Sequence, residues 1–257
     1  MLKSIALWNY GSDQIANAQK FKELGFEAFS FLGRLFDQQT PEEDAAVAEC
    51  MKRLHAPMTI HHRFPNPSDA EAVSIFFRNM EHILSWQKRY GLLTGLTFDF
   101  GHSPETLCPL LGKVIQMFRG SGAFLACEDH PLDEKEMEYF APYITPEDNF
   151  GILIDCGHMH LRHTSAGKSN SHDVAKALMH LPLPLMEVHL SGNHGLRDEH
   201  LPPEEGTFPM DGFVQGLQTL GFDGLCTIER VPREEEYQTS ILKAKNSIEW
   251  FLTHFRK

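Results

Sequence analysis

The chain has 257 residues, of which 42% are hydrophobic and 23% charged, the composition of an ordinary globular protein with ample material for a core. Its formal net charge of −12, without any Lys/Arg-rich run, disfavours nucleic acid as a partner, because binding through phosphates draws much of its affinity from a basic surface. No stretch approaches the roughly 20 apolar residues that a membrane span needs, so we expect no membrane-spanning helix.

Short apolar runs alternate along the chain with longer amphipathic stretches, a pattern typical of a parallel sheet whose strands are joined by crossover helices. In chain order, the apolar runs predict strands at residues 4–8, 28–32, 58–61, 96–100, 124–128, 152–155, 185–190 and 225–229. The amphipathic stretches predict helices at residues 13–24, 42–54, 68–89, 104–118, 133–140, 172–180, 211–220 and 234–255.

These eight strand–helix pairs use the whole chain. We therefore predict a single α/β domain over residues 1–257, a (β/α)8 TIM barrel, for which about 250 residues is a typical length. The alternative is an open doubly wound sheet, but no glycine-rich phosphate-binding loop follows the first predicted strand. Five cysteines, an odd number without paired CxxC spacing, favour buried thiols in a reducing, cytoplasmic compartment.

The ends of the predicted strands carry ionisable side chains, and the active site of a (β/α)8 barrel lies at this C-terminal rim. A single Asp or His at a strand end is more often a cap or a turn residue. Several together favour a metal site, because burying many carboxylates around one axis is costly unless a cation neutralises them. Oxygen and imidazole ligands without thiolate suit Mn, Zn, Co or Mg. From the third strand to the eighth, the residues concerned are His61, Asp99 with His102, Glu128, Asp155 with His158, His189 and Glu229.

The segment after the seventh predicted strand adds three candidates. Asp198 and His200 are two residues apart, and in an extended segment they point to the same side, where both can contact one ion. An ordinary solvent loop is the alternative interpretation. Arg197 is a candidate substrate contact, against the alternative of an exposed or ion-paired arginine.

Several motifs from the third strand onward resemble those of one known superfamily. They are the Asp155-x-Gly157-His158 element, the His189 strand end, the Asp198-x-His200 pair followed by Glu205-Gly206, and the final Glu229. The superfamily is that of the xylose isomerase-like barrels. It includes sugar and sugar-phosphate isomerases and epimerases, inosose dehydratases and endonuclease IV.

The similarity to the keto-sugar epimerases and inosose dehydratases implies one divalent ion held by Glu128, Asp155, His189 and Glu229. It also implies that Glu128 and Glu229 form the acid/base pair and that His158 contacts substrate. The expected activity is that of an isomerase or epimerase of a small sugar, sugar phosphate or inosose-like carbonyl compound. Glutamate-mediated proton transfer would pass through a metal-stabilised enediolate. The expected partner is this carbohydrate; whether the chain forms a homo-oligomer stays open.

The similarity to endonuclease IV implies a different centre, a phosphodiesterase site with two to three zinc ions. His61 would then join Glu128 and Glu229, while His158, Asp198 and His200 would make the third zinc site. That family expects a histidine at the end of the fourth strand, where this chain has Asp99, with His102 three residues on. A barrel that binds a metal or ligand without catalysis is a further alternative, which the presence of both glutamates disfavours.

Overall fold

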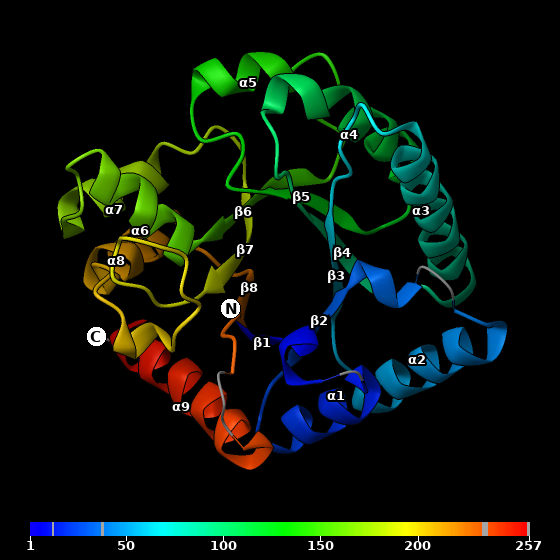
Figure 1. Ribbon diagram of the computed structural model, residues 1–257, viewed down its shortest axis with the longest axis horizontal. Coiled ribbons are helices and arrows are strands. Elements are labelled where there is room, and N and C mark those ends of the chain that lie inside the picture. The colour runs from blue at the N-terminus through cyan, green and yellow to red at the C-terminus, as the bar shows by residue number, and fades with distance from the viewer. Residues whose placement is uncertain (12, 37–38, 233–235, 256–257) are drawn as a thin grey trace. The chain divides into compact units, whose positions relative to one another are not determined.

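The computed structural model describes residues 1–257 except 12, 37–38, 233–235 and 256–257. Eight strands are hydrogen-bonded in the order β1-β2-β3-β4-β5-β6-β7-β8 and close into a barrel (Figure 1). The predicted (β/α)8 fold is confirmed. The strands are Leu2–Ala6 (β1), Ala28–Leu32 (β2), Met58–Arg63 (β3), Leu93–Asp99 (β4), Phe124–Glu128 (β5), Phe150–Asp155 (β6), Leu185–Leu190 (β7) and Leu225–Ile228 (β8).

Helices connect these strands, and most begin within two residues of the predicted positions. They are Gln14–Glu23 (α1), Pro41–Leu54 (α2), Ala70–Tyr90 (α3), Pro104–Phe118 (α4), Glu134–Phe140 (α5), Cys156–Ser165 (α6), Ser171–Met179 (α7), Met210–Leu220 (α8) and Tyr237–Phe255 (α9). Short 3-10 segments cover Leu7–Tyr10 (η1), Gly33–Phe36 (η2) and Pro203–Glu205 (η3). The predicted start of the last helix, at 234, lies outside the described residues.

The ends of β3, β4, β6 and β8 differ from the sequence prediction by one to three residues, and two further differences have a local cause. The first strand ends at Ala6 rather than at residue 8, because the chain turns into η1 at Leu7. Helix α6 was not predicted; it begins directly after β6, where the Asp155 side chain accepts a hydrogen bond from the backbone N–H of His158 and caps the first turn. The same carboxylate therefore ends a strand and begins a helix.

The chain divides into two compact units. Unit 1 comprises residues 1–29, 153–181 and 185–257, and unit 2 comprises residues 30–152 and 182–184. In unit 2, aromatic rings from consecutive elements pack against one another: Phe64 lies 5.1 Å from Phe76 and 5.4 Å from Phe100 between ring centroids. Such pairs add to the hydrophobic free energy gained when these large side chains are buried.

In unit 1, α7 and α8 pack closely, and glycine makes this approach possible. A β-carbon at Gly212 would collide with backbone atoms of Ser171, the first residue of α7. One turn further along α8, a β-carbon at Gly216 would lie 2.7 Å from a methyl group of Leu178. The helix pair that flanks β7 thus depends on two positions without side chains.

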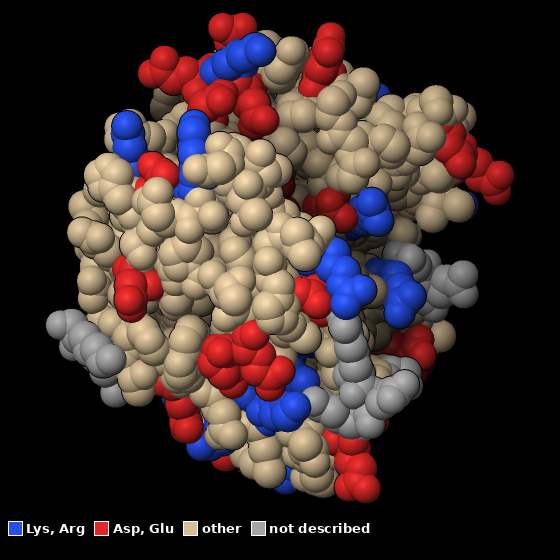
Figure 2. Space-filling view, turned by 60° about the vertical axis from the view of Figure 1, so that its left-hand side comes forward, with Lys and Arg blue, Asp and Glu red and all other residues tan. Residues whose placement is uncertain are grey.

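Charged side chains of both signs lie interspersed on the face shown in Figure 2, as expected for a solvent-exposed surface. Within the described ranges, none of the helices combines the length and the apolar character that crossing a membrane requires.

Candidate metal centre

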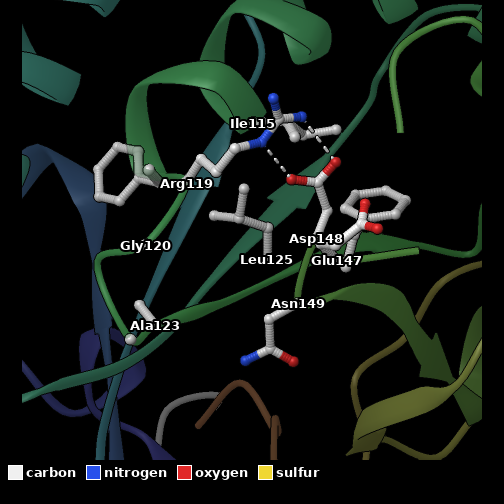
Figure 3. A pocket seen from close by; sticks show the side chains of 11 residues that line it. Ile115, Arg119, Gly120, Ala123, Leu125, Glu147, Asp148 and Asn149 are labelled. Carbon is white, nitrogen blue, oxygen red and sulfur yellow. Dashed lines mark hydrogen bonds and ion pairs between the residues drawn. The ribbon is translucent and has the colours of Figure 1, made fainter. Parts of the chain in front are cut away.

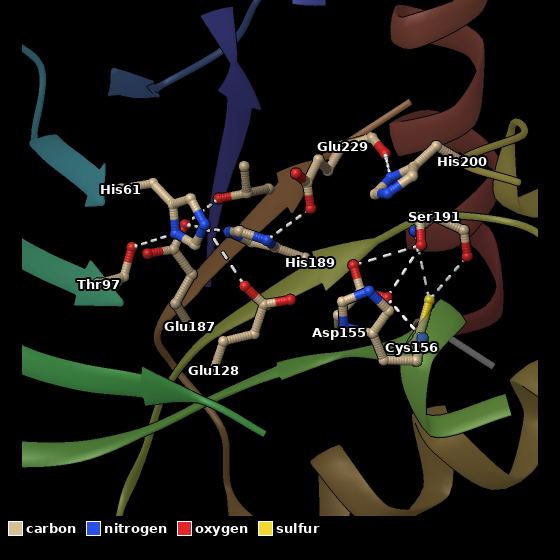
Figure 4. A network of polar contacts seen from close by, with 12 residues as sticks. His61, Thr97, Glu128, Asp155, Cys156, Glu187, His189, Ser191, His200 and Glu229 are labelled. Carbon is tan, nitrogen blue, oxygen red and sulfur yellow. Dashed lines mark hydrogen bonds and ion pairs between the residues drawn. The ribbon is translucent and has the colours of Figure 1, made fainter. Parts of the chain in front are cut away.

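Three buried ionisable side chains lie at the carboxyl ends of neighbouring strands in unit 1 (Figure 4). Asp155 is the last residue of β6, His189 is the last but one of β7, and Glu229 directly follows β8. Asp155 and His189 are completely buried, and Glu229 is 9% exposed. Because the strands run parallel, their carboxyl ends share one edge, which is the functional end of barrels of this kind.

The Asp155 carboxylate is held by hydrogen bonds from two directions. The backbone N–H of His158 donates to Oδ1 at 2.9 Å, and the hydroxyl of Ser191 donates to the same oxygen at 3.0 Å. The positive end of the α6 dipole also favours a negative charge at this position. Cys156, the next residue, donates its thiol to the carbonyl oxygen of Ser191 at 3.1 Å. The carboxylate is therefore fixed in orientation, while the thiol is engaged by the backbone.

His189 lies between two carboxylates of unit 1. Its Nδ1 atom is 2.8 Å from Oε2 of Glu229, and its Nε2 atom is 3.5 Å from Oε1 of Glu187. Burial lowers the pKa of His189, but the two carboxylates outweigh burial and raise that pKa well above its usual range. The Trp8 ring lies 6.5 Å from the imidazole between centroids and forms an apolar neighbour of the site.

Glu187 was not among the residues that the sequence analysis selected. It is completely buried, lies two residues before His189 on β7, and accepts a hydrogen bond from the hydroxyl of Thr227 on β8. The sequence did contain a signal, because residues i and i+2 of a strand point to the same face. The Glu187-Val-His189 spacing could therefore have indicated a second carboxylate beside the imidazole.

A second cluster of unit 1 consists of His158, Asp198 and His200. Oδ2 of Asp198 lies 2.8 Å from Nε2 of His200 and 3.3 Å from Nε2 of His158. One ligand atom from each of the three residues lies within 4.8 Å of the others, which is the spacing of a metal-binding group. Nδ1 of His200 also lies 3.0 Å from the carbonyl oxygen of Glu229, so the backbone links this cluster to the first.

The electrostatics of this second cluster are those of an ion-paired triad. Burial raises the pKa of Asp198, but its hydrogen bonds to the two imidazoles prevail and hold that pKa well below its usual range. Burial lowers the pKa of His200, yet Asp198, Glu229 and Asp155 together raise it to about 10. The raised pKa favours the protonated form of His200, whose positive charge would offset part of the negative charge of these carboxylates.

The expected juxtaposition of Asp198 and His200 is present, but the reason given for it was wrong. His200 has a φ of 47°, in the left-handed region, so this segment is not an extended strand. The chain instead makes a bridge between Gly192 and Leu201, and this folds the intervening residues into a loop. Loop closure, rather than strand alternation, brings the two side chains together.

Arg197, predicted to contact substrate, lies in the same loop and is paired with Glu199. Its Nε and Nη2 atoms each lie 3.3 Å from Oε1 of Glu199, and the Arg197 side chain is 74% exposed. The backbone N–H of His194 donates to the other oxygen of Glu199 at 3.0 Å. The alternative interpretation, an ion-paired arginine, describes its position here, while a substrate contact stays a prediction.

Unit 2 contains the predicted residues His61 and Glu128. His61 is 8% and Glu128 6% exposed, and Nε2 of His61 lies 3.4 Å from Oε2 of Glu128. Nδ1 of His61 lies 2.9 Å from the hydroxyl oxygen of Thr97, which is its Cα partner in the β3–β4 register. The fifth strand therefore presents a buried carboxylate at its carboxyl end, as predicted.

Asp99 and His102 are placed differently from that pair. The Cα partner of Asp99 is Arg63, and Oδ2 of Asp99 lies 3.3 Å from Nε of this arginine. His102 is exposed in the loop before α4. The fourth-strand residue beside His61 is thus Thr97, whose hydroxyl is a poor substitute for the histidine that a trinuclear zinc centre of the endonuclease IV type requires.

A pocket elsewhere in unit 2 is lined by Arg119 at the end of α4 and by Asp148 before β6 (Figure 3). Arg119 donates to both oxygens of Asp148, at 2.8 and 2.9 Å, and Asp148 also accepts from the backbone N–H of Thr145. These residues precede β5 and β6 and so belong to the amino-terminal ends of the strands. In barrels of this kind that side serves stability rather than chemistry.

The donor set in unit 1 fits a hard or borderline divalent cation. Asp155, His189 and Glu229 offer two carboxylates and one imidazole, the ligands preferred by Mn, Co, Zn and Mg. Glu187 adds a fourth buried group, and its Oε2 atom has no hydrogen-bond partner among the described residues. Three buried carboxylates around one imidazole leave negative charge that a cation would balance.

Comparison with known proteins gives a family match over most of the chain. A family model described as the xylose isomerase-like TIM barrel matches residues 18–252. An uncharacterised protein of Methanocaldococcus jannaschii, MJ1311, is 32% identical over 81 residues, which are 32% of this chain and 26% of that protein. The chain thus matches about a quarter of the length of this relative.

Solved structures share the fold over the full length. A D-tagatose 3-epimerase-like protein is 16% identical and has a TM-score of 0.75, with 100% of this chain and 98% of that chain covered. A D-psicose 3-epimerase, crystallised in the presence of D-fructose, is 13% identical, with a TM-score of 0.75 and 99% of both chains covered. A xylose isomerase domain protein from Alicyclobacillus acidocaldarius is 17% identical, with a TM-score of 0.74 and full coverage of both chains.

Proposed function

The chain belongs to the xylose isomerase-like TIM barrel family, and on this basis we propose that it is a divalent-metal-dependent isomerase or epimerase. Its substrate would be a small polyhydroxylated carbonyl compound: a sugar, a sugar phosphate or an inosose-like compound. The observation that carries the proposal is the buried cluster of Asp155, His189 and Glu229 at the carboxyl ends of β6, β7 and β8. The proposed activity is argued from the residues of the site, because this fold supports many unrelated activities.

We assign Glu128 as the fourth ligand of the ion. It is the last residue of β5, and β5 precedes β6 in the strand order of the barrel. Carboxyl ends of neighbouring parallel strands lie at one rim, where barrel enzymes assemble their sites. The family resemblance supports the same set of four. The two residues predicted to bind substrate, His158 and Arg197, are proposed to contact its hydroxyl groups.

The proposed chemistry is a proton transfer at the carbon next to the carbonyl group. A divalent ion in this centre would offset the negative charge that develops on the substrate oxygens when that proton leaves. One of the two glutamates, Glu128 or Glu229, takes the proton, and the C–H electron pair passes into the enediolate of the substrate. The other glutamate, protonated beforehand, returns a proton to the opposite face. The glutamate that acts as base would need to lie within hydrogen-bond distance of the proton that it takes, and the other glutamate would need to reach the same carbon from the opposite face.

Within this class, epimerisation of a ketose at the carbon beside the carbonyl is the reaction we favour. The D-tagatose 3-epimerase-like protein and the D-psicose 3-epimerase match this chain from end to end. The aromatic ring of Trp8, 6.5 Å from His189 between centroids, would offer an apolar surface to one face of a sugar.

Hydrogen exchange in D2O tests the proposal whichever product the enzyme forms. The protein is incubated with Mn²⁺, Co²⁺ or Mg²⁺ and with D-psicose, D-tagatose, L-ribulose or an inosose, and NMR follows deuterium entering the carbon next to the carbonyl. We expect exchange with at least one ketose, and its loss in Glu229→Gln at saturating metal. Arg119→Gln, at the amino-terminal ends of the strands, serves as the control that retains exchange. If metal-loaded protein exchanges none of these compounds, or Glu229→Gln is fully active, the proposal fails.

A zinc phosphodiesterase is the second candidate, because His158, Asp198 and His200 form a group with metal-ligand spacing. Two observations weigh against it. Thr97 is the residue that lies beside His61, and the net charge of −12 does not suit a nucleic acid substrate. Hydrolysis of bis(p-nitrophenyl) phosphate by the zinc-loaded protein, lost in His200→Ala, would favour this candidate over the epimerase.

A further inference from the structure

Glu187 is a buried carboxylate that the proposed ligand set does not use. Its residue and side chain are completely buried. One oxygen, Oε1, accepts a hydrogen bond from the hydroxyl of Thr227 and lies 3.5 Å from Nε2 of His189. The other oxygen, Oε2, has no hydrogen-bond partner in the part of the chain that is described. Its ion-pair partner there is His189, and neither lysine nor arginine pairs with it within those ranges.

Such a group is costly in the interior of a barrel. A buried carboxylate without a full set of donors is disfavoured by the hydration that it loses, whereas a buried leucine at this position would contribute favourably. Two neighbouring residues of β7, Val188 and Leu190, are also fully buried, and both are apolar, as is usual in a protein interior. Glu187 therefore carries a cost that calls for a compensating interaction.

The group that faces Glu187 at ion-pair distance is one edge of the His189 ring, while the other edge of the ring faces Glu229. Nδ1 faces Glu229 at 2.8 Å, and Nε2 faces Glu187 at 3.5 Å (Figure 4). A neutral imidazole has one N–H donor and one lone pair. If the N–H is on Nε2, directed to Glu187, then the lone pair on Nδ1 is directed to the side where Glu229 lies. A carboxylate behind a metal-binding histidine fixes the ring in this way and strengthens it as a ligand.

The β7–β8 register places the third member of this arrangement. Thr227 is the Cα partner of His189, and its hydroxyl donates to Oε1 of Glu187. Thr227 is itself completely buried, and Glu229 lies two residues further along the chain. The strands β7 and β8, with the residue that directly follows β8, thus carry two of the four proposed ligands, His189 and Glu229, together with Glu187 and Thr227.

We propose that Glu187, oriented by Thr227, is a positioning residue that holds the Nε2 edge of His189 and so directs Nδ1 to the metal ion. This inference rests on the metal centre of the proposed function, but not on the identity of the substrate. The negative charge of Glu187, separated from the ion by the His189 ring, would also raise the affinity of the site for a divalent cation.

Metal affinity is the measurement that tests this inference. Zn²⁺ and Mn²⁺ dissociation constants are determined by competition with a chromophoric chelator for the wild type, Glu187→Gln and Thr227→Val. We expect binding roughly 10- to 100-fold weaker in Glu187→Gln, the usual effect of losing a carboxylate behind a ligand histidine. Thr227→Val keeps the charge and should lose only a few-fold. Equal dissociation constants for the wild type and Glu187→Gln would overturn the inference.

Two further readouts separate positioning from a merely structural role. Removing a buried charge should leave the Tm of metal-free Glu187→Gln equal to that of the wild type or raise it, whereas a structural carboxylate would lower it. In the ¹⁵N-histidine NMR spectrum of the Zn²⁺-loaded wild type, His189 should bind through Nδ1 and carry its proton on Nε2. Binding through Nε2 would overturn the inference even if the variants do not fold.

A wild type that binds no divalent ion contradicts the proposed metal centre itself. A wild type that binds metal but lacks epimerase activity contradicts the proposed function and leaves the test of Glu187 intact.

Discussion

Nδ1 of His189 lies 2.8 Å from Oε2 of Glu229, and both side chains are buried at the carboxyl ends of adjacent strands. The contact joins two residues that we propose as ligands of one ion. Metal binding would therefore replace an existing hydrogen bond between them, and the cation would take over the role of the shared proton. The stability of the protein should respond to metal for this reason, and the first prediction measures that response.

Divalent metal should raise the Tm of the wild type. Ligand at 100 times its dissociation constant stabilises the folded state by about 2.7 kcal/mol. For a chain of this size that corresponds to a rise of roughly 5 to 10 °C. His189→Gln should lose most of this rise, because it removes the imidazole ligand. Calorimetry of both proteins with and without Mn²⁺ measures the difference, and a metal-induced rise that is the same in the two proteins contradicts the assignment of His189.

Elemental analysis of purified protein should distinguish a mononuclear centre from a multinuclear one. We expect about one Mn, Co or Zn ion per chain, lost in Glu128→Ala and kept in His200→Ala, since the proposed ion is held by four ligands that do not include His200. Two to three zinc ions per chain, with one lost in His200→Ala, would instead support the zinc phosphodiesterase.

Asp148 should make stability depend on pH in the acid range. Hydrogen bonds from Arg119 hold the pKa of Asp148 below its usual 3.8, although burial acts in the opposite direction. The unfolded chain therefore takes up this proton first on acidification. The stability that Asp148 contributes is present above about pH 4 and is lost as the pH falls through its lowered pKa.

Asp148→Asn should consequently flatten the fall in the free energy of unfolding between pH 5 and pH 3. At pH 7 the variant should be less stable by only about 1 kcal/mol, because the Arg119 side chain is 49% exposed and solvent weakens the ion pair. Urea unfolding at several pH values measures both effects. The wild type and Asp148→Asn having the same slope below pH 5 would show that this ion pair does not contribute.

Gly212→Ala should destabilise the protein, although alanine is the better helix former by about 1 kcal/mol. The added methyl group would meet the backbone of Ser171, which cannot move without shifting α7. We expect a net loss of roughly 1 to 3 kcal/mol, as for other overpacked sites. Gly216→Ala is the matched control, since its methyl group meets the flexible Leu178 side chain and should cost less. An increase in Tm for Gly212→Ala would contradict this account of the helix packing.

Most of the barrel could be predicted from the chain itself. Short apolar runs and amphipathic stretches are local patterns, and β2, β5, β7 and α4 begin and end at the predicted residues. Helix α6 was not predicted, because the signal for it was a capping side chain, Asp155, that the sequence analysis had assigned only to a strand end. That Asp155 both ends β6 and caps α6 can be recognised only once both elements are known.

For the candidate site, the sequence determined which residue types stand at the strand ends, because parallel strands of a barrel bring their carboxyl ends to one rim wherever the helices fall. It did not determine which residue lies beside which. That Thr97 rather than Asp99 is the partner of His61 follows from the β3–β4 register. That Glu187 is completely buried beside His189 follows from the packing of β7, whose last four residues are buried on both faces. Register and burial are set by packing between segments far apart in the chain, so only the tertiary structure decides them.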